Sequence, residues 1–279
     1  LTLNPQRYLS LTAEVDTVLH AAADVRHYAP EAELLAANLG GCEQMLRFAD
    51  TAEASFLHIS TVSVSGSHLR NAPQMPAIMN EDDLDIGQNW ADNPYAKSKL
   101  LAEAAVARAV AEGLNARIFR VGRLFGRAAD GLFQMNAESN AFYRLLSGIK
   151  RLGCLPQRFR EMPLELTPVD LCAQAITLLA SAPGAAFHVF NPIEIPLASL
   201  AQAVGEMRFI EDKQFSELLK RQAGGVDTYI DAVAEAWFAG KEFAANIRLD
   251  QRRTLFALAL AGFTWPSPRL ELIVRCVRE

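Results

Sequence analysis

Short apolar runs alternate with helical patterns through the first 190 residues, and this alternation limits the possible folds more than any other feature of the sequence. Nearly continuous apolar runs are typical of buried parallel strands, which are joined through right-handed helical crossovers. The runs that predict strands are residues 15–23, 56–59, 117–121 and 187–190. The patterns that predict helices are residues 31–50, 93–112 and 170–180. This order predicts an α/β fold built on a parallel sheet.

The pattern changes after residue 193 and becomes mostly helical. Apolar residues recur at helical spacing around 197–204, 215–222, 229–238 and 249–261. We therefore predict two parts. Residues 1–125 and 166–192 form a Rossmann-like nucleotide-binding part, and residues 126–165 and 193–279 form a smaller, mostly helical lobe that faces the substrate or carrier.

No predicted strand leads into a G-x-G-x-x-G turn. Gly40-Gly41 falls within a helical pattern, and Gly224-Gly225 lies in the helical lobe. A dinucleotide site needs such a turn to hold the pyrophosphate. The prediction is therefore an incomplete Rossmann-like sheet, whose N-terminal strands and glycine-rich turn are absent from this chain.

Composition and charge exclude several classes of partner. The net charge of −5 gives no reason to expect nucleic acid or an anionic membrane as the main partner. The longest apolar run, residues 255–263, is too short to span a bilayer. The four cysteines, Cys42, Cys154, Cys172 and Cys276, form no C-x-x-C pair. We interpret them as reduced thiols of a cytoplasmic protein.

The histidines show no spacing typical of metal ligands, so we predict no metal site. His20 and His58 lie within strand patterns, and we interpret them as structural residues.

The residues with the clearest chemical meaning are Tyr95, Lys99 and Thr61. Asn93-Pro94 predicts the start of a helix, so Tyr95 and Lys99, four residues apart, share one face of its first turns. Thr61 ends a predicted strand, where ligands bind in open α/β sheets. A nearby ammonium is expected to lower the pKa of the phenol from about 10 and to make it a general acid. The alternative is a surface Tyr–Lys pair with an unrelated threonine.

Six dispersed segments carry a resemblance to a known family. They are residues 15–25 (VDTVLHAAADV), 58–64 (HISTVSV), 120–127 (RVGRLFGR), 130–134 (DGLFQ), 166–170 (LTPVD) and 262–266 (GFTWP). Together with Thr61 and the Tyr95-x-x-x-Lys99 pair, they resemble extended short-chain dehydrogenases/reductases. More narrowly, the chain resembles the terminal thioester reductase domains of nonribosomal peptide synthetases, in matching order from residue 1 to the end.

The resemblance implies a role for each matching residue. Tyr95 would donate the proton, Lys99 would also hold the nicotinamide ribose, and Thr61 would position the thioester carbonyl. The cofactor would be lined by Ala21, Ala22, Val121 and Gly122. Asn38 lies where this superfamily often has an asparagine that supports a water relay, and simple helix packing is the alternative for it.

The implied activity is reductive release by NADPH of a peptidyl or acyl thioester from a carrier protein. The product is an aldehyde, which the family can reduce further to the alcohol. The implied partner is the phosphopantetheine arm of a carrier protein within a larger synthetase. Two alternatives stay open: another extended short-chain enzyme, such as a nucleotide-sugar epimerase or dehydratase, and a non-catalytic carrier-binding domain.

Overall fold

The computed structural model describes the chain apart from residues 1–3, 27–28, 92, 225–226, 239–245 and 276–279. Cys276 therefore lies outside the described residues. The chain divides into two compact units. Unit 1 comprises Leu1–Gly122, Gln174–Phe190 and Ala245–Thr264, and unit 2 comprises Arg123–Ala173, Asn191–Ala244 and Trp265–Glu279.

Unit 1 is built on a parallel sheet with the strand order β1-β2-β4-β9. The strands are β1 (Thr17–His20), β2 (Ser55–Thr61), β4 (Ala116–Val121) and β9 (Ala186–Val189). Every neighbouring pair in this sheet runs parallel, with His20 opposite His58 and Thr61 opposite Val121. The predicted parallel sheet is confirmed, and the C-terminal ends of its strands meet at one edge.

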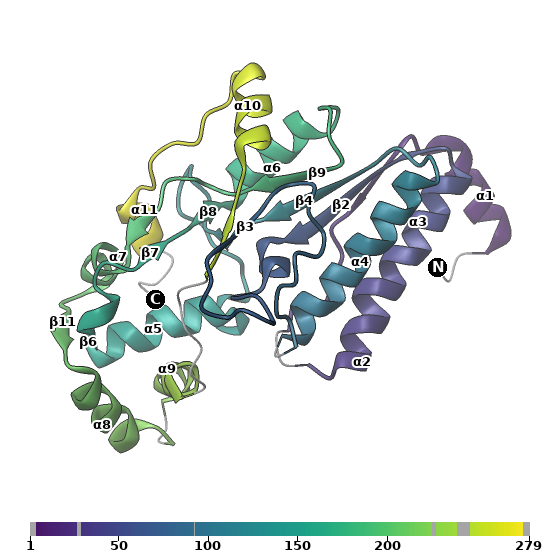
Figure 1. Cartoon of the computed structure of the whole chain (residues 1–279). Helices are drawn as coiled ribbons and strands as arrows, with labels where there is room; N and C mark the ends of the chain where they lie inside the picture. The colour runs from purple at the N-terminus through teal and green to yellow at the C-terminus, as the bar shows by residue number, and fades with distance from the viewer. Residues whose placement is uncertain (1–3, 27–28, 92, 225–226, 239–245, 276–279) are drawn as a thin grey trace. The chain divides into compact units, whose positions relative to one another are not determined.

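Helices cover the sheet and close its core. Helices α3 (Gly41–Thr51) and α4 (Pro94–Ala111) lie side by side along the strands, with α3 against β1 and α4 against β2 and β4 (Figure 1). Their apolar faces and the strands share one buried cluster that includes Leu46, Phe56 and Val106. The remaining helices of unit 1 are α1 (Pro5–Glu14), α2 (Glu31–Leu34) and α10 (Arg252–Leu260), and α6 (Val169–Leu179) runs from unit 2 into unit 1.

The helix predicted over 31–50 is interrupted by a π-helical segment, η1 (Leu35–Gly40), between α2 and α3. Such segments are rare, and they occur frequently at functional sites. Asn38 lies within η1 and is buried. The π-helical segment therefore contains Asn38, one of the site residues predicted from the sequence.

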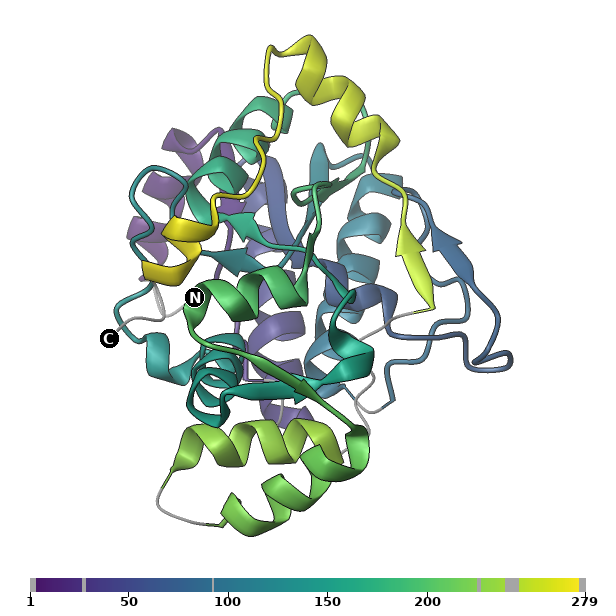
Figure 2. The same ribbon diagram turned by 90° about the vertical axis from the view of Figure 1, so that its left-hand side faces the viewer.

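Residues 66–92 contain the short strand β3 (Ala77–Met79). It pairs in parallel with β12 (Ile247–Leu249), and Figure 2 shows the two strands side by side. Because β12 is far from β3 in the sequence, no local sequence pattern predicts this strand pair. The 3-10 turn η2 (Val62–Ser65) follows β2 directly.

This pairing also changes the expected division of the chain. Residues 245–264 belong to unit 1, although the sequence pattern predicted that all of residues 193–279 form the lobe. The physical reason is the β3–β12 pair together with Thr254 of α10, whose backbone N–H donates to Glu81 Oε1 at 2.9 Å. Glu81 is buried by this contact.

Unit 2 is mostly helical, as predicted for the lobe. Its helices are α5 (Ala141–Leu152), α7 (Leu197–Val204), α8 (Asp212–Gln222), α9 (Thr228–Phe238) and α11 (Leu270–Arg275). Two-stranded pairs connect them: β5 (Leu124–Phe125) with β8 (Thr167–Pro168), β6 (Cys154–Pro156) with β11 (Arg208–Ile210), and β7 (Pro163–Leu164) with β10 (Ile195–Pro196). The short 3-10 turns η3 (Ala137–Ser139) and η4 (Gln157–Phe159) complete the unit. Its core is aliphatic and aromatic, and includes Leu146, Leu200 and Phe215.

Helices α5 and α9 cross closely at Gly148. A Cβ at this position would lie 2.2 Å from Tyr229 O and 2.6 Å from Val233 Cγ2. Gly148→Ala is therefore expected to force the helices apart and to lower the free energy of unfolding by about 1–3 kcal/mol, measured by thermal and chemical denaturation. Gly41→Ala in α3 is the matched control, because a Cβ there meets nothing within 4 Å. Equal stability of the two variants would contradict close packing at Gly148.

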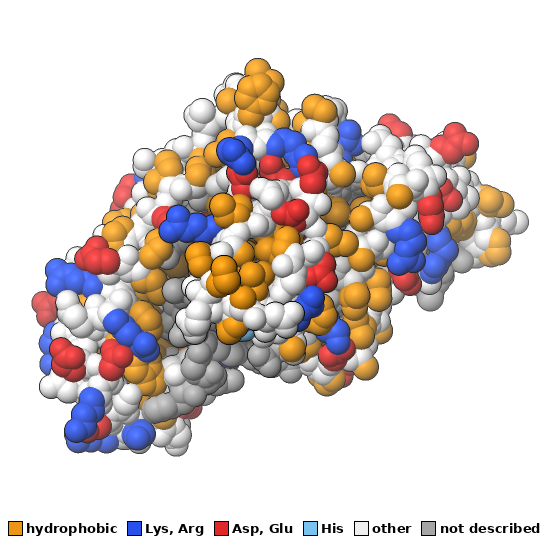
Figure 3. All heavy atoms as spheres, in the orientation of Figure 1, with side chains coloured by type: hydrophobic (Ala, Val, Ile, Leu, Met, Phe, Trp, Pro, Cys, Tyr) orange, Lys and Arg blue, Asp and Glu red, His pale blue; other side chains and the backbone are white. Residues whose placement is uncertain are grey.

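Charged side chains of both signs are interspersed over the face of the molecule shown in Figure 3. This mixture agrees with the modest net charge of −5. Among the described residues, none of the helices combines the length and the apolar character that a membrane crossing requires.

Candidate active site

The first two turns of α4 carry Tyr95 and Lys99 into the interior of unit 1. Asn93 caps the helix, because its Oδ1 accepts the backbone N–H of Ala96 at 3.0 Å, and Pro94 occupies the first helical position. Tyr95 is 9% exposed and Lys99 is 2% exposed. The pair is therefore buried, and the alternative of a surface Tyr–Lys pair does not apply.

Thr61 lies at the end of β2, as its place in the sequence predicted. Its Oγ1 accepts the backbone N–H of Ser63 at 3.2 Å, and its side chain is hydrogen-bonded to Tyr95. The structure thus brings the strand-end hydroxyl and the phenol together.

The pKa of Tyr95 moves in the direction opposite to our expectation. Burial raises it, and the hydrogen bond with Thr61 offsets this only partly. The physical reason is that a phenolate loses its hydration in the interior, which penalises the charged form. Because a phenol is protonated below its pKa, Tyr95 carries its proton at neutral pH. That is the form a proton donor needs.

Lys99 is held by successive residues of β2. Its Nζ donates to Ile59 O at 2.7 Å and lies 3.3 Å from His58 Nε2. Burial lowers the pKa of Lys99 to about 8, and the charges of Cys42 and Glu103 act in the opposite direction. The side chain is therefore mainly an ammonium at neutral pH and loses its proton as the pH rises through about 8.

Asn38 connects η1 to α4 and to the chain that follows β1. Its Nδ2 donates to Ser98 Oγ at 2.9 Å and to Asp24 O at 3.0 Å, and its Oδ1 accepts the Asp24 N–H at 2.7 Å. Ser98 Oγ in turn donates to Tyr95 O at 2.8 Å. Asn38 thus fixes the backbone on both sides of the site, and its role in a water relay stays a prediction.

The four residues expected to line a cofactor lie at the carboxyl ends of two strands of the sheet, β1 and β4, which flank β2. Ala21 and Ala22 follow β1 directly and are exposed. Val121 is the buried last residue of β4, and the N–H of Gly122 donates to Val189 O at 3.1 Å. Ala21, Ala22 and Gly122 have no side chain larger than a methyl group, which fits the close approach of a dinucleotide to the strand ends of an open α/β sheet.

A layer of buried polar residues next to the site was not predicted from the sequence. His58, interpreted as structural, contacts Lys99 and lies 3.1 Å from His20, measured between the two Nδ1 atoms. Further along the same helix, Glu103 forms a buried ion pair with Arg120 at 2.8 Å. A signal was present: Lys99 and Glu103 are spaced i, i+4 on α4, and His58 and Ser60 are spaced i, i+2 on β2, so each pair shares a face.

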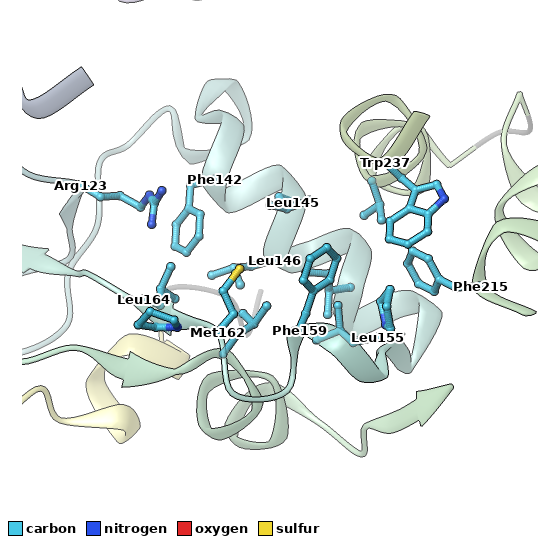
Figure 4. A pocket seen from close by; sticks show the side chains of 15 residues that line it. Arg123, Phe142, Leu145, Leu146, Leu155, Phe159, Met162, Leu164, Phe215 and Trp237 are labelled. Atoms are coloured by element: carbon cyan, nitrogen blue, oxygen red, sulfur yellow. The ribbon is translucent and has the colours of Figure 1, made fainter. Parts of the chain in front are cut away.

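Unit 2 contains an apolar cavity of about 80 Å³. Figure 4 shows Arg123 beside Phe142 at one end, and Phe159, Phe215 and Trp237 at the other. The guanidinium of Arg123 lies 4.9 Å from the centre of the Phe142 ring. The cavity is continuous with the apolar core of unit 2, and Arg123 is the one charged residue among those that line it.

The match to a family model shows the family to which this chain belongs. The NAD-binding family described as male sterility protein matches residues 1–176, which is more than half of the chain. The chain belongs to this family. The match covers the strands β1, β2 and β4 and the helix that carries Tyr95 and Lys99.

Two curated relatives and one solved structure show which members of the family are similar to this chain. Glycine betaine reductase ATRR of Emericella nidulans is 32% identical over 194 residues, which are 68% of this chain and 15% of that protein. One of the linear gramicidin synthase proteins of Brevibacillus parabrevis is 28% identical over 239 residues, which are 84% of this chain and 4% of that protein. A thiolation-reductase di-domain from an archaeal non-ribosomal peptide synthetase superposes with a TM-score of 0.84 at 28% identity, over 97% of this chain and 58% of that chain.

These matches confirm the resemblance to reductase domains of nonribosomal peptide synthetases and the Rossmann-like fold. The chain is a domain of an NAD(P)-binding reductase family. It spans only a small fraction of the curated relatives that it matches, each of which is a much longer protein.

Proposed function

We propose that this protein reduces a peptidyl or acyl thioester, presented by a carrier protein, to an aldehyde with NADPH. The observation that supports the proposal most is the buried group of Thr61, Tyr95 and Lys99, in which the phenol is hydrogen-bonded to the hydroxyl and the ammonium is fixed to the same strand. The membership of reductase domains in larger synthetases supports the carrier protein as partner.

The residues of the chain account for the steps around the carbonyl. NADPH, when bound, supplies the hydride that adds to the thioester carbon. The Thr61 hydroxyl holds the carbonyl oxygen, and Tyr95 transfers its proton to that oxygen as negative charge develops there. The resulting hemithioacetal loses the phosphopantetheine thiol as its C–S bond breaks, which gives the aldehyde. One thioester, one hydride and one proton thus yield one aldehyde and one thiol.

Lys99, Ala21, Ala22, Val121 and Gly122 are the residues that would hold the cofactor. An ammonium has three donors, and Ile59 O and His58 Nε2 engage two of them. The third is suited to a ribose hydroxyl. The apolar cavity of unit 2 is suited to an apolar acyl group or amino-acid side chain of the substrate.

The proposal is tested with the purified protein, NADPH and a series of acyl-pantetheine thioesters. We expect oxidation of NADPH that depends on the thioester, with release of free thiol and an aldehyde identified by mass spectrometry, and slower oxidation of NADH. Acyl chains of increasing length probe the cavity of unit 2. Turnover of a nucleotide sugar in place of the thioester would support an epimerase instead. Binding of the carrier protein without any oxidation of NADPH would support the alternative of a non-catalytic carrier-binding domain.

A further inference from the structure

His58 occupies a position between Lys99 and His20 in the interior of unit 1. It lies on β2 and is 0% exposed. Its Nε2 is 3.3 Å from Lys99 Nζ, and its Nδ1 is 3.1 Å from His20 Nδ1 on the neighbouring strand. The rings of the two histidines are stacked, with centroids 5.3 Å apart. Both ring nitrogens of His58 therefore have partners within hydrogen-bonding distance.

The chemistry of these partners selects one tautomer. An ammonium can only donate, so His58 Nε2 must accept from Lys99. The proton of the neutral His58 ring is then on Nδ1, where it is donated to His20 Nδ1, and His20 carries its own proton on Nε2. Burial, followed by the charge of Lys99, lowers the pKa of His58 well below its usual value and also lowers the pKa of His20. Both rings are accordingly neutral at neutral pH.

This arrangement restricts a side chain that is otherwise flexible. Lysine has a four-carbon stem and an ammonium whose donors rotate freely. Here Ile59 O and His58 Nε2, from successive residues of β2, fix two directions of the Nζ group. The remaining donor direction is thereby defined. Burial lowers the pKa of Lys99, and a hydrogen bond that the ammonium donates to His58 Nε2 acts in the opposite direction, because it favours the charged form.

We propose that His58, held in one tautomer by His20, is a positioning residue that orients the Lys99 ammonium and keeps it protonated. Only the expected effect on turnover rests on the proposed function. The contact between His58 and Lys99 does not depend on it.

A metal site is the competing explanation for the same residues. The ligand atoms of His20, Cys42 and His58 all lie within 4.8 Å of one another. Two features argue against it. Burial raises the pKa of the Cys42 thiol to about 12, so the thiolate that a metal needs is disfavoured. A dication there would also lie close to the ammonium of Lys99, whereas two neutral, hydrogen-bonded imidazoles add no charge.

The test measures the pKa of Lys99 by NMR with lysine labelled at the side-chain carbons, assigned through Lys99→Met. The titratable groups around Lys99 are His58 of β2, His20 of β1, Cys42 of α3, and Tyr95 and Glu103 of α4. His58→Leu removes the acceptor and is expected to lower the pKa of Lys99 by about one unit. His58→Gln places an amide oxygen near the position of Nε2 and is expected to restore it. Leu57→Val, a substitution of a buried apolar residue on the opposite face of β2, is the matched control and should leave it unchanged.

Turnover gives a second readout. If turnover requires protonated Lys99, the alkaline limb of the pH profile of kcat should move to lower pH in His58→Leu. In His58→Gln it should return to the position of the wild type. Thermal unfolding confirms that each variant folds. An unchanged Lys99 pKa in His58→Leu would overturn the inference, even if Tyr95→Phe abolishes turnover. A stoichiometric metal that is lost from Cys42→Ala would overturn it too. Failure of the wild-type protein to oxidise NADPH would remove the proposed function, while the NMR titration would still decide the contact.

Discussion

Replacement of Tyr95 by phenylalanine is expected to slow thioester-dependent oxidation of NADPH by about 10²- to 10⁴-fold, the usual contribution of a positioned general acid. The variant keeps the buried ring and loses only the hydroxyl that is hydrogen-bonded to Thr61. Because Tyr95 holds its proton at neutral pH, we expect this hydroxyl to supply the proton in the reaction. The measurement is kcat with an acyl-pantetheine thioester.

The same variant should bind NADPH with an unchanged Kd, since the ring still fills its place against the helix. Tyr8→Phe is the matched control: Tyr8 packs edge-on against Phe48 with ring centroids 5.4 Å apart, on the far helix α1. It removes a phenol hydroxyl from unit 1 without touching the site, and its kcat should match that of the wild type. Retention of more than about a tenth of the activity by Tyr95→Phe would show that another group donates the proton.

Local signals in the sequence were sufficient for much of the fold and of the site. The helix start at Asn93-Pro94 depends on a side-chain cap and a fixed proline φ, both of which are local, and α4 begins at Pro94 as predicted. Strand β4 (Ala116–Val121) and helix α7 (Leu197–Val204) follow their apolar patterns closely, because such patterns report burial. Thr61 could be placed for the same reason, since it directly follows a buried run.

Features that depend on distant partners could not be predicted in this way. Strand β3 is only three residues long, and its partner β12 is near the other end of the chain. The direction of the pKa shift of Tyr95 depends on how completely the phenol is buried, which spacing alone does not report. The acceptor for Lys99 on His58 depends on β2 and α4 meeting in one register, and each sequence pattern is compatible with several registers.

Replacement of Arg120 by methionine is expected to lower the free energy of unfolding by about 3–5 kcal/mol, because it leaves a buried carboxylate without its counter-charge. Arg120 is 1% exposed, and its NH2 donates to Glu103 Oε2 at 2.8 Å and to Asp83 O at 2.7 Å. Ser60 Oγ also donates to Glu103. The single hydroxyl of Ser60 cannot replace the guanidinium as the partner of the carboxylate. The loss of Arg120 should therefore destabilise the folded state. Chemical denaturation measures the loss.

The double variant Arg120→Met/Glu103→Leu separates the cost of an unpaired charge from the net contribution of the pair. Apolar residues of similar volume often replace a buried ion pair with little loss or even a gain, so the double variant should recover most of the stability that the single variant loses. Arg117→Met is the matched control on the same strand, because the Arg117 side chain donates to Ala182 O and Asn115 Oδ1, and its loss should cost less than about 1 kcal/mol. If the double variant is as unstable as Arg120→Met, the guanidinium stabilises unit 1 through Asp83 and the packing around it rather than through Glu103.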